Sequence, residues 1–150
     1  MEKSISLFDQ IREVFAVEEV EAKQYSPLTL AYIGDAVYEI IIRTVLVGYA
    51  NAPVNMLNKK ASSLVKAQAQ ANLIHALEED LTEEELAVYK RGRNAKSATT
   101  AKNASIKDYR TATGFEALIG YLYMSNQMDR ALELVKCGLN KLEEDFRLKK

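Results

Sequence analysis

The sequence predicts an all-α fold, a compact multi-helix domain that spans residues 1–150. Three observations carry this prediction. Apolar residues recur at the spacing of an amphipathic helix along almost the whole chain. Only 2 prolines and 6 glycines are present, too few for the frequent turns of a many-stranded β fold. The length of 150 residues suits one domain and is too short for two ordinary ones.

The N-terminal part predicts a lead-in and then a long central helix. Residues 1–24 are expected to form an amphipathic N-terminal helix and its connection to the domain. Ser26 followed by Pro27 is a helix-start signal, with serine at the N-cap and proline in the first turn. Residues 28–47 are apolar on nearly all sides, so they are expected to form the central buried helix, which Gly48 ends.

The remainder of the chain predicts further helices separated by one loop. An apolar stripe opens at a proline and continues at helical spacing. Thr82 and Glu85 then have the spacing of a capping box, which starts another helix. The expected segments are a helix over 53–79, a short helix over 82–89, a loop over 90–110 and helices over 109–125 and 128–146.

Composition excludes several classes of protein. The single cysteine, Cys137, allows no internal disulfide and no structural zinc cage, and the single histidine, His75, allows no histidine-rich metal site. No apolar run reaches about 18 residues, and no basic-then-apolar leader is present, so neither a transmembrane nor a secretory segment is predicted. A cytoplasmic protein without membrane association is therefore expected.

Positive charge is concentrated in one segment. The formal net charge is −1, but residues 90–110 carry seven basic residues and one acid, a net +6 that leaves −7 on the remainder. Such a patch suits a phosphate backbone, because each neutralised phosphate releases condensed counterions. The alternative is a solvated charged loop, but the interleaved small polar residues would let the backbone approach phosphates, which favours nucleic acid. The candidate binding residues are Lys90, Arg91, Arg93, Asn94, Lys96 and Lys102.

Two acids lie in helices that are expected to be buried. Asp35 is in the central helix and Glu116 in a later one, and a buried acid is costly unless it is paired, hydrogen-bonded or bound to a metal. The nearby Gly34, Gly114 and Gly120 would let the two helices approach closely and bring the acids together. A hard divalent cation such as Mg²⁺ would relieve their repulsion. The alternative is that each acid pairs with a basic side chain.

Another polar pair on the central helix has a simpler explanation. Glu39 and Arg43 are four residues apart, which is the spacing of a surface ion pair. We therefore expect a structural role for this pair rather than a catalytic one.

The sequence also resembles a known family. Residues 32–37 (Tyr-Ile-Gly-Asp-Ala-Val) and 115–120 (Phe-Glu-Ala-Leu-Ile-Gly) are similar to the two signature helices of the ribonuclease III catalytic domain. Between them, residues 90–96 (Lys-Arg-Gly-Arg-Asn-Ala-Lys) resemble the basic loop of the Mini-III ribonucleases, bacterial members that consist of the catalytic domain alone. The resemblance covers most of the chain, and we expect no separate double-stranded-RNA-binding domain of the kind that larger members append.

The resemblance implies an all-α endonuclease that forms a homodimer and cuts double-stranded RNA with Mg²⁺, leaving 5′-phosphate ends. Asp35 and Glu116 match the two signature acids, so they would act in catalysis and bind the metal. The segment at 90–110 would grip the RNA. The resemblance further suggests a precursor of large-subunit ribosomal RNA as the substrate.

The sequence departs from the larger family members at two positions. Those members have further acids where Ala31 and Thr113 stand here, so fewer protein ligands are expected for the metal. This departure motivates the alternative function, a non-catalytic RNA-binding or ribosome-associated helical dimer.

Overall fold

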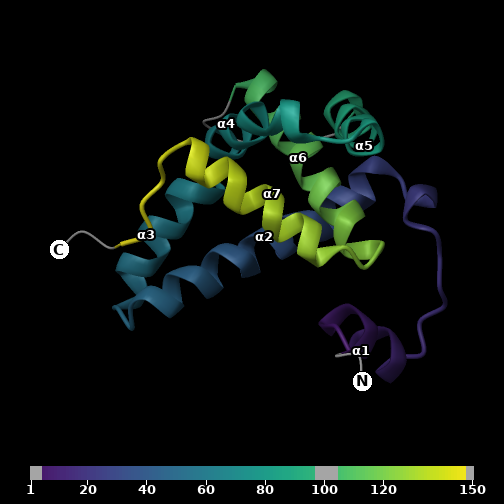
Figure 1. The fold of residues 1–150 in the computed structure, drawn as a ribbon, viewed down its shortest axis with the longest axis horizontal. Coiled ribbons are helices and arrows are strands. Elements are labelled where there is room, and N and C mark those ends of the chain that lie inside the picture. The colour runs from purple at the N-terminus through teal and green to yellow at the C-terminus, as the bar shows by residue number, and fades with distance from the viewer. Residues whose placement is uncertain (1–4, 97–104, 148–150) are drawn as a thin grey trace.

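A computed structural model describes residues 5–96 and 105–147, and within these ranges it contains helices and no strand, which confirms the all-α prediction (Figure 1). Two short 3-10 turns, at Ala22–Gln24 and Glu78–Asp80, precede α2 and α5. The α-helices are α1 (Leu7–Val14), α2 (Pro27–Tyr49), α3 (Val54–Val65), α4 (Ala67–Leu77), α5 (Glu83–Asn94), α6 (Ile106–Met124) and α7 (Met128–Lys141).

Helix α6 forms the centre of the core. From Thr111 to Leu122, every residue except Glu116 is buried. Helices α2, α4 and α5 pack around α6, while α7 packs against α4 and α6. The Phe115 ring of α6 meets the Tyr38 ring of α2 edge to face, with ring centroids 5.1 Å apart. The half-buried Glu116 therefore interrupts an otherwise buried helix surface.

The N-terminal helix α1 contacts the end of α6 and the turn after it. The Phe8 ring meets the Tyr123 ring at 5.2 Å, and the Asn126 amide donates to the Asp9 carboxylate. Figure 1 shows α1 at the opposite end of the molecule from α4 and α5. The extended segment between α1 and α2 covers this distance, as expected for a lead-in.

Sequence signals located two helix starts correctly. Ser26 accepts a hydrogen bond from the Thr29 backbone at 3.2 Å, with Pro27 in the first turn of α2. Thr82 and Glu85 form the predicted capping box at the start of α5. Both signals are local, so they act wherever the chain is placed in the fold.

Three predicted boundaries are wrong. The helix expected over 53–79 is broken at Lys66, whose backbone is extended (ψ 157°), giving α3 and α4. The helix expected over 82–89 continues to Asn94 and α6 begins at Ile106, so both ends of the loop expected over 90–110 are helical; residues 97–104 lie outside the described residues. The last helix ends at Lys141, and Glu143 just beyond it adopts a positive φ of 56°, which a continued helix does not allow.

Helix α2 is not buried on all sides as predicted. One face lies in the core through Leu30, Ile42 and Leu46, but Tyr32 is 82% exposed and Ile40 is 57% exposed. The apolar composition of this helix therefore reflects a core face and a second, unpartnered apolar face. Among the described residues, no helix is both long and apolar enough to cross a bilayer.

Candidate active site

The two predicted acids lie together. The Glu116 carboxyl is half-buried and in hydrogen-bonding contact with the Asp35 carboxyl, and burial followed by this contact raises the pKa of Glu116 to about 9. Asp35 itself is exposed, which corrects the prediction that both acids are buried. The site is therefore open to solvent on the α2 side and lined by the core on the α6 side.

Backbone contact between α2 and α6 sets the separation of the acids. A Cβ atom on Gly34 would lie 1.7 Å from the Glu116 carbonyl oxygen, and one on Gly120 would lie 1.9 Å from the Leu30 carbonyl oxygen. Only glycine permits this approach, which confirms the predicted close packing of the two helices at these positions. Gly114 has a different role from the one predicted, because a Cβ there would meet Tyr89 of α5.

The donor set near the acids is small. Among the described residues, no third His, Cys, Asp or Glu joins them, and neither acid forms an ion pair with a lysine or arginine. Ala31 and Thr113 are buried, and the Thr113 hydroxyl donates to the Tyr109 carbonyl at 2.9 Å. The alternative that each acid pairs with a basic side chain is therefore not observed.

The chemistry of this pair fits a divalent cation. Two carboxyl groups in contact cannot both ionise cheaply, and the raised pKa of Glu116 reflects this. A hard cation removes the repulsion, and oxygen donors are the ligands that Mg²⁺ prefers. With two acids available, most of its remaining coordination sites would be filled by water.

Sequence reasoning missed one residue at this site. Gln70 of α4 is 3% exposed, and its amide lies beside the Glu116 carboxyl, where it lowers the pKa of Glu116 and so opposes the effect of Asp35. The missed signal was a polar residue in an apolar stripe, because Gln70 precedes the buried Leu73 and Ile74 by one helical turn.

The predicted binding residues lie mainly on the last turn of α5 and not on a loop. Lys90, Arg91, Asn94 and Lys96 are exposed. Arg93 is half-buried, with its guanidinium 5.5 Å from the centroid of the Tyr89 ring and its Nε donating to Asn94. Lys102 lies outside the described residues.

Gly92 connects this basic helix end to the acids. A Cβ on Gly92 would meet the Ala117 Cβ at 2.7 Å and the Gly114 Cα at 2.9 Å, so α5 and α6 touch through these small residues. Ala117 and Gly114 lie within two residues of Glu116. The basic end of α5 is therefore anchored on α6 within one helical turn of the acid.

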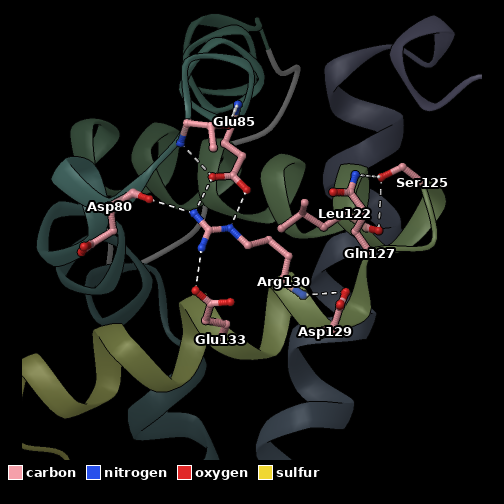
Figure 2. Close-up of polar contacts among 9 residues, drawn as sticks. Asp80, Glu85, Leu122, Ser125, Gln127, Asp129, Arg130 and Glu133 are labelled. Atoms are coloured by element: carbon pink, nitrogen blue, oxygen red, sulfur yellow. Dashed lines mark hydrogen bonds and ion pairs between the residues drawn. The ribbon is translucent and has the colours of Figure 1, made fainter.

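A buried ion pair fixes the other end of α5 (Figure 2). Arg130 of α7 donates to both carboxylate oxygens of Glu85 at 2.8 and 2.9 Å, and also to the Asp80 carbonyl and to Glu133. Arg130 and the Thr82 backbone N–H lower the pKa of Glu85 against the opposing effect of burial. The predicted Glu39–Arg43 surface pair also forms, at 2.8 Å.

The order of the acids, the basic segment between them and this helical core can be compared with known proteins. The family model of the ribonuclease III domain matches residues 28–127. The chain belongs to the ribonuclease III family. This match covers α2 to the turn after α6, and so includes both acids, Gln70 and the basic end of α5.

Relatives of this ribonuclease III domain share most of its length. The chain is 52% identical to Mini-ribonuclease 3 of Clostridium tetani over 89% of this chain and 91% of that protein. It is 44% identical to Mini-ribonuclease 3 of Thermoanaerobacter sp. over 96% of this chain and 100% of that protein. The crystal structure of protein FN1578 from Fusobacterium nucleatum matches with a TM-score of 0.73 at 28% identity, covering 81% of this chain and 97% of that one.

Proposed function

We propose that this ribonuclease III domain is a Mg²⁺-dependent endoribonuclease that cuts double-stranded RNA. The observation that carries the proposal is the contact between Asp35 and Glu116, two acids from different core helices with no basic partner among the described residues. Family membership supplies the reaction class, and the acids supply a place for the metal.

In this proposal, Asp35 and Glu116 hold the ion. A bound divalent cation lowers the pKa of a coordinated water and stabilises negative charge on the scissile phosphate. Glu116, whose pKa of about 9 keeps it protonated at neutral pH without metal, must release its proton to become a ligand. The Gly34 and Gly120 contacts hold both acids in place, so little reorganisation is needed when the ion binds.

The basic end of α5 is proposed to grip the RNA. Lys90, Arg91 and Lys96 are exposed, and none forms an ion pair within the described ranges. The major groove of an A-form duplex is too narrow for side chains to read, so phosphate contacts should dominate over base contacts. Affinity should then fall steeply with salt.

The exposed apolar face of α2 supports a homodimer. Tyr32, Ile40 and Val47 are large apolar residues that remain exposed along this one helix. A second copy packed there would place two acid pairs near one duplex, one for each strand. The substrate we propose is a precursor of large-subunit ribosomal RNA, which is what the resemblance to the Mini-III ribonucleases implies.

The test is cleavage of a long RNA duplex in the presence of Mg²⁺. Asp35→Asn and Glu116→Gln should each abolish cleavage and still bind the duplex, since the basic end of α5 is unchanged. Glu39→Gln, which removes a neighbouring carboxylate from the Arg43 surface pair, is the matched control and should cleave normally. Normal cleavage by Asp35→Asn would refute the proposed site.

A second candidate function is a non-catalytic RNA-binding dimer. The small donor set favours it, because Ala31 and Thr113 supply no carboxylate. Duplex binding without cleavage by the unmutated protein, over a wide range of Mg²⁺ and Mn²⁺ concentrations, would support this second function and exclude the first.

A further inference from the structure

Gln70 has an unusual environment for an amide. It is 3% exposed on α4, in a position where the helix otherwise buries Leu73, Ile74 and Leu77. Its Nε2 donates to the Val65 carbonyl at 2.8 Å, and its amide also reaches the Glu116 carboxyl. Its Oε1 has no hydrogen-bond partner among the described residues. The amide nitrogen is thus hydrogen-bonded, whereas the oxygen has no partner in the described part of the chain.

The orientation of this amide is fixed by chemistry. Val65 is the last residue of α3, and terminal carbonyls of a helix have no partner within it, so this one is free to accept from Gln70. The reverse orientation would place two oxygens against each other. Since an NH₂ group has two hydrogens, one can bond Val65 and the other Glu116. The helix break at Lys66 therefore supplies the anchor that aims the amide at Glu116.

Stability alone does not explain this choice of residue. A buried acceptor without a partner destabilises the fold, whereas an apolar side chain of similar shape carries no such cost. An amide that leaves its oxygen unsatisfied while it holds one particular carboxyl indicates a role for that contact. Residues that orient metal ligands in this manner commonly affect metal binding almost as strongly as the ligands do.

We propose that Gln70 is a positioning residue of the metal site, which holds the Glu116 carboxylate in the orientation that binds a divalent cation. This inference rests on the proposed function, because it needs Asp35 and Glu116 to be metal ligands. Gln70 does not touch the substrate. Its effect is transmitted through Glu116.

The test measures metal binding directly. The metal-free protein is titrated with Mn²⁺, and free Mn²⁺ is followed by electron paramagnetic resonance. Gln70→Met, which is unbranched and close in volume, should weaken Mn²⁺ binding by about tenfold or more. Gln68→Met is the matched control, since Gln68 is exposed on the same helix, and it should bind Mn²⁺ as the parent does.

Two further measurements separate positioning from a merely structural role. In cleavage assays, Gln70→Met should need about tenfold more Mg²⁺ for half-maximal rate and keep the parent KM for the duplex. Its melting temperature in EDTA should stay close to that of the parent. If Gln70→Met does not fold, Gln70→Asn serves instead, because it keeps an amide but is too short to reach Val65 and Glu116 together.

The outcomes are distinct. Parent-like Mn²⁺ affinity in a folded Gln70→Met, together with lost affinity in Asp35→Asn, would overturn the role of Gln70 and leave the proposed function intact. Absence of Mn²⁺ binding by the parent protein would overturn both. Loss of duplex binding in Gln70→Met without divalent cation would show a structural defect and would also overturn the inference.

Discussion

Replacing Glu116 by glutamine should stabilise the metal-free protein at alkaline pH while it abolishes activity. The pKa of Glu116 is raised from 4.5 to about 9 by burial and by the neighbouring Asp35. Between these two values the folded chain keeps a proton that the unfolded chain has released. The free energy of unfolding therefore falls as pH rises, by up to about 1.4 kcal/mol per pH unit.

The size of the effect follows from this window. From about pH 5 to about pH 8, one such group lowers the free energy of unfolding by about 4 kcal/mol if it is fully shielded from solvent. The Glu116 carboxyl retains contact with solvent, so the expected decrease is about 3 kcal/mol. Glutamine at position 116 resembles the protonated acid and carries no proton to lose. The variant should match the parent near pH 5 and exceed its stability by about 3 kcal/mol near pH 8.

Urea denaturation followed by far-ultraviolet circular dichroism, in EDTA and across this pH range, measures the difference. Glu39→Gln is the control, because it removes a carboxylate from α2 without touching the acid pair. Mg²⁺ should raise the stability of the parent at pH 8 and leave Glu116→Gln unaffected. Parallel pH profiles for the parent and Glu116→Gln would refute the reasoning that the acid pair retains a proton.

Three other predictions concern packing, the ion pair and RNA. Gly34→Ala should destabilise the protein by about 3 kcal/mol or more in thermal melts, since the new Cβ would meet the Glu116 carbonyl. The control Gly48→Ala should be neutral or stabilising, because a Cβ at position 48 has no other atom within 4 Å. Equal losses of stability in the two variants would contradict the close contact of the helices. Arg130→Met should cost about 3 kcal/mol in urea denaturation by leaving the buried Glu85 without its cationic partner, and the exposed Arg147→Met should have no measurable effect. Because the pKa of Glu85 is lowered, the stability from this pair should be lost as pH falls below about 4.5. Replacing Lys90, Arg91 and Lys96 by alanine should lower the slope of log Kd for duplex RNA against log salt concentration by about 2 to 3. The control replaces Arg43, Lys59 and Lys136, and an equal change in slope there would exclude the basic end of α5 as the RNA-binding surface.

Local signals in the sequence account for the features that were predicted correctly. The Ser26-Pro27 start and the Thr82–Glu85 capping box act through neighbours in the chain, so they hold in any tertiary setting. Gly34 in an otherwise apolar helix indicates that another backbone comes close to α2 there, and the structure shows that this backbone is α6 at Glu116. The contact between the two acids could be predicted because both depend on the same pair of helices.

The features that were missed depend on residues far apart in the chain. The break at Lys66 involves neither glycine nor proline; the Leu64 carbonyl there accepts from the Tyr38 hydroxyl, which is 26 positions away. The Arg130–Glu85 pair joins residues 45 positions apart. Asp35 was expected to be buried because α2 is apolar nearly all round, and the sequence does not reveal which of its two faces packs on α6.

The main-chain contact at Gly34 and Gly120 has a consequence for how this enzyme can be altered. Since main-chain atoms meet there, the spacing of the two helices at the carboxyl pair is set at positions 34 and 120, and a larger residue at either position would force the helices apart. Exposed side chains of α3 and α7 other than Arg130 lie away from this crossing and are open to redesign. The α2–α6 crossing is not open to redesign, because replacing Gly34 or Gly120 would disable catalysis and folding together.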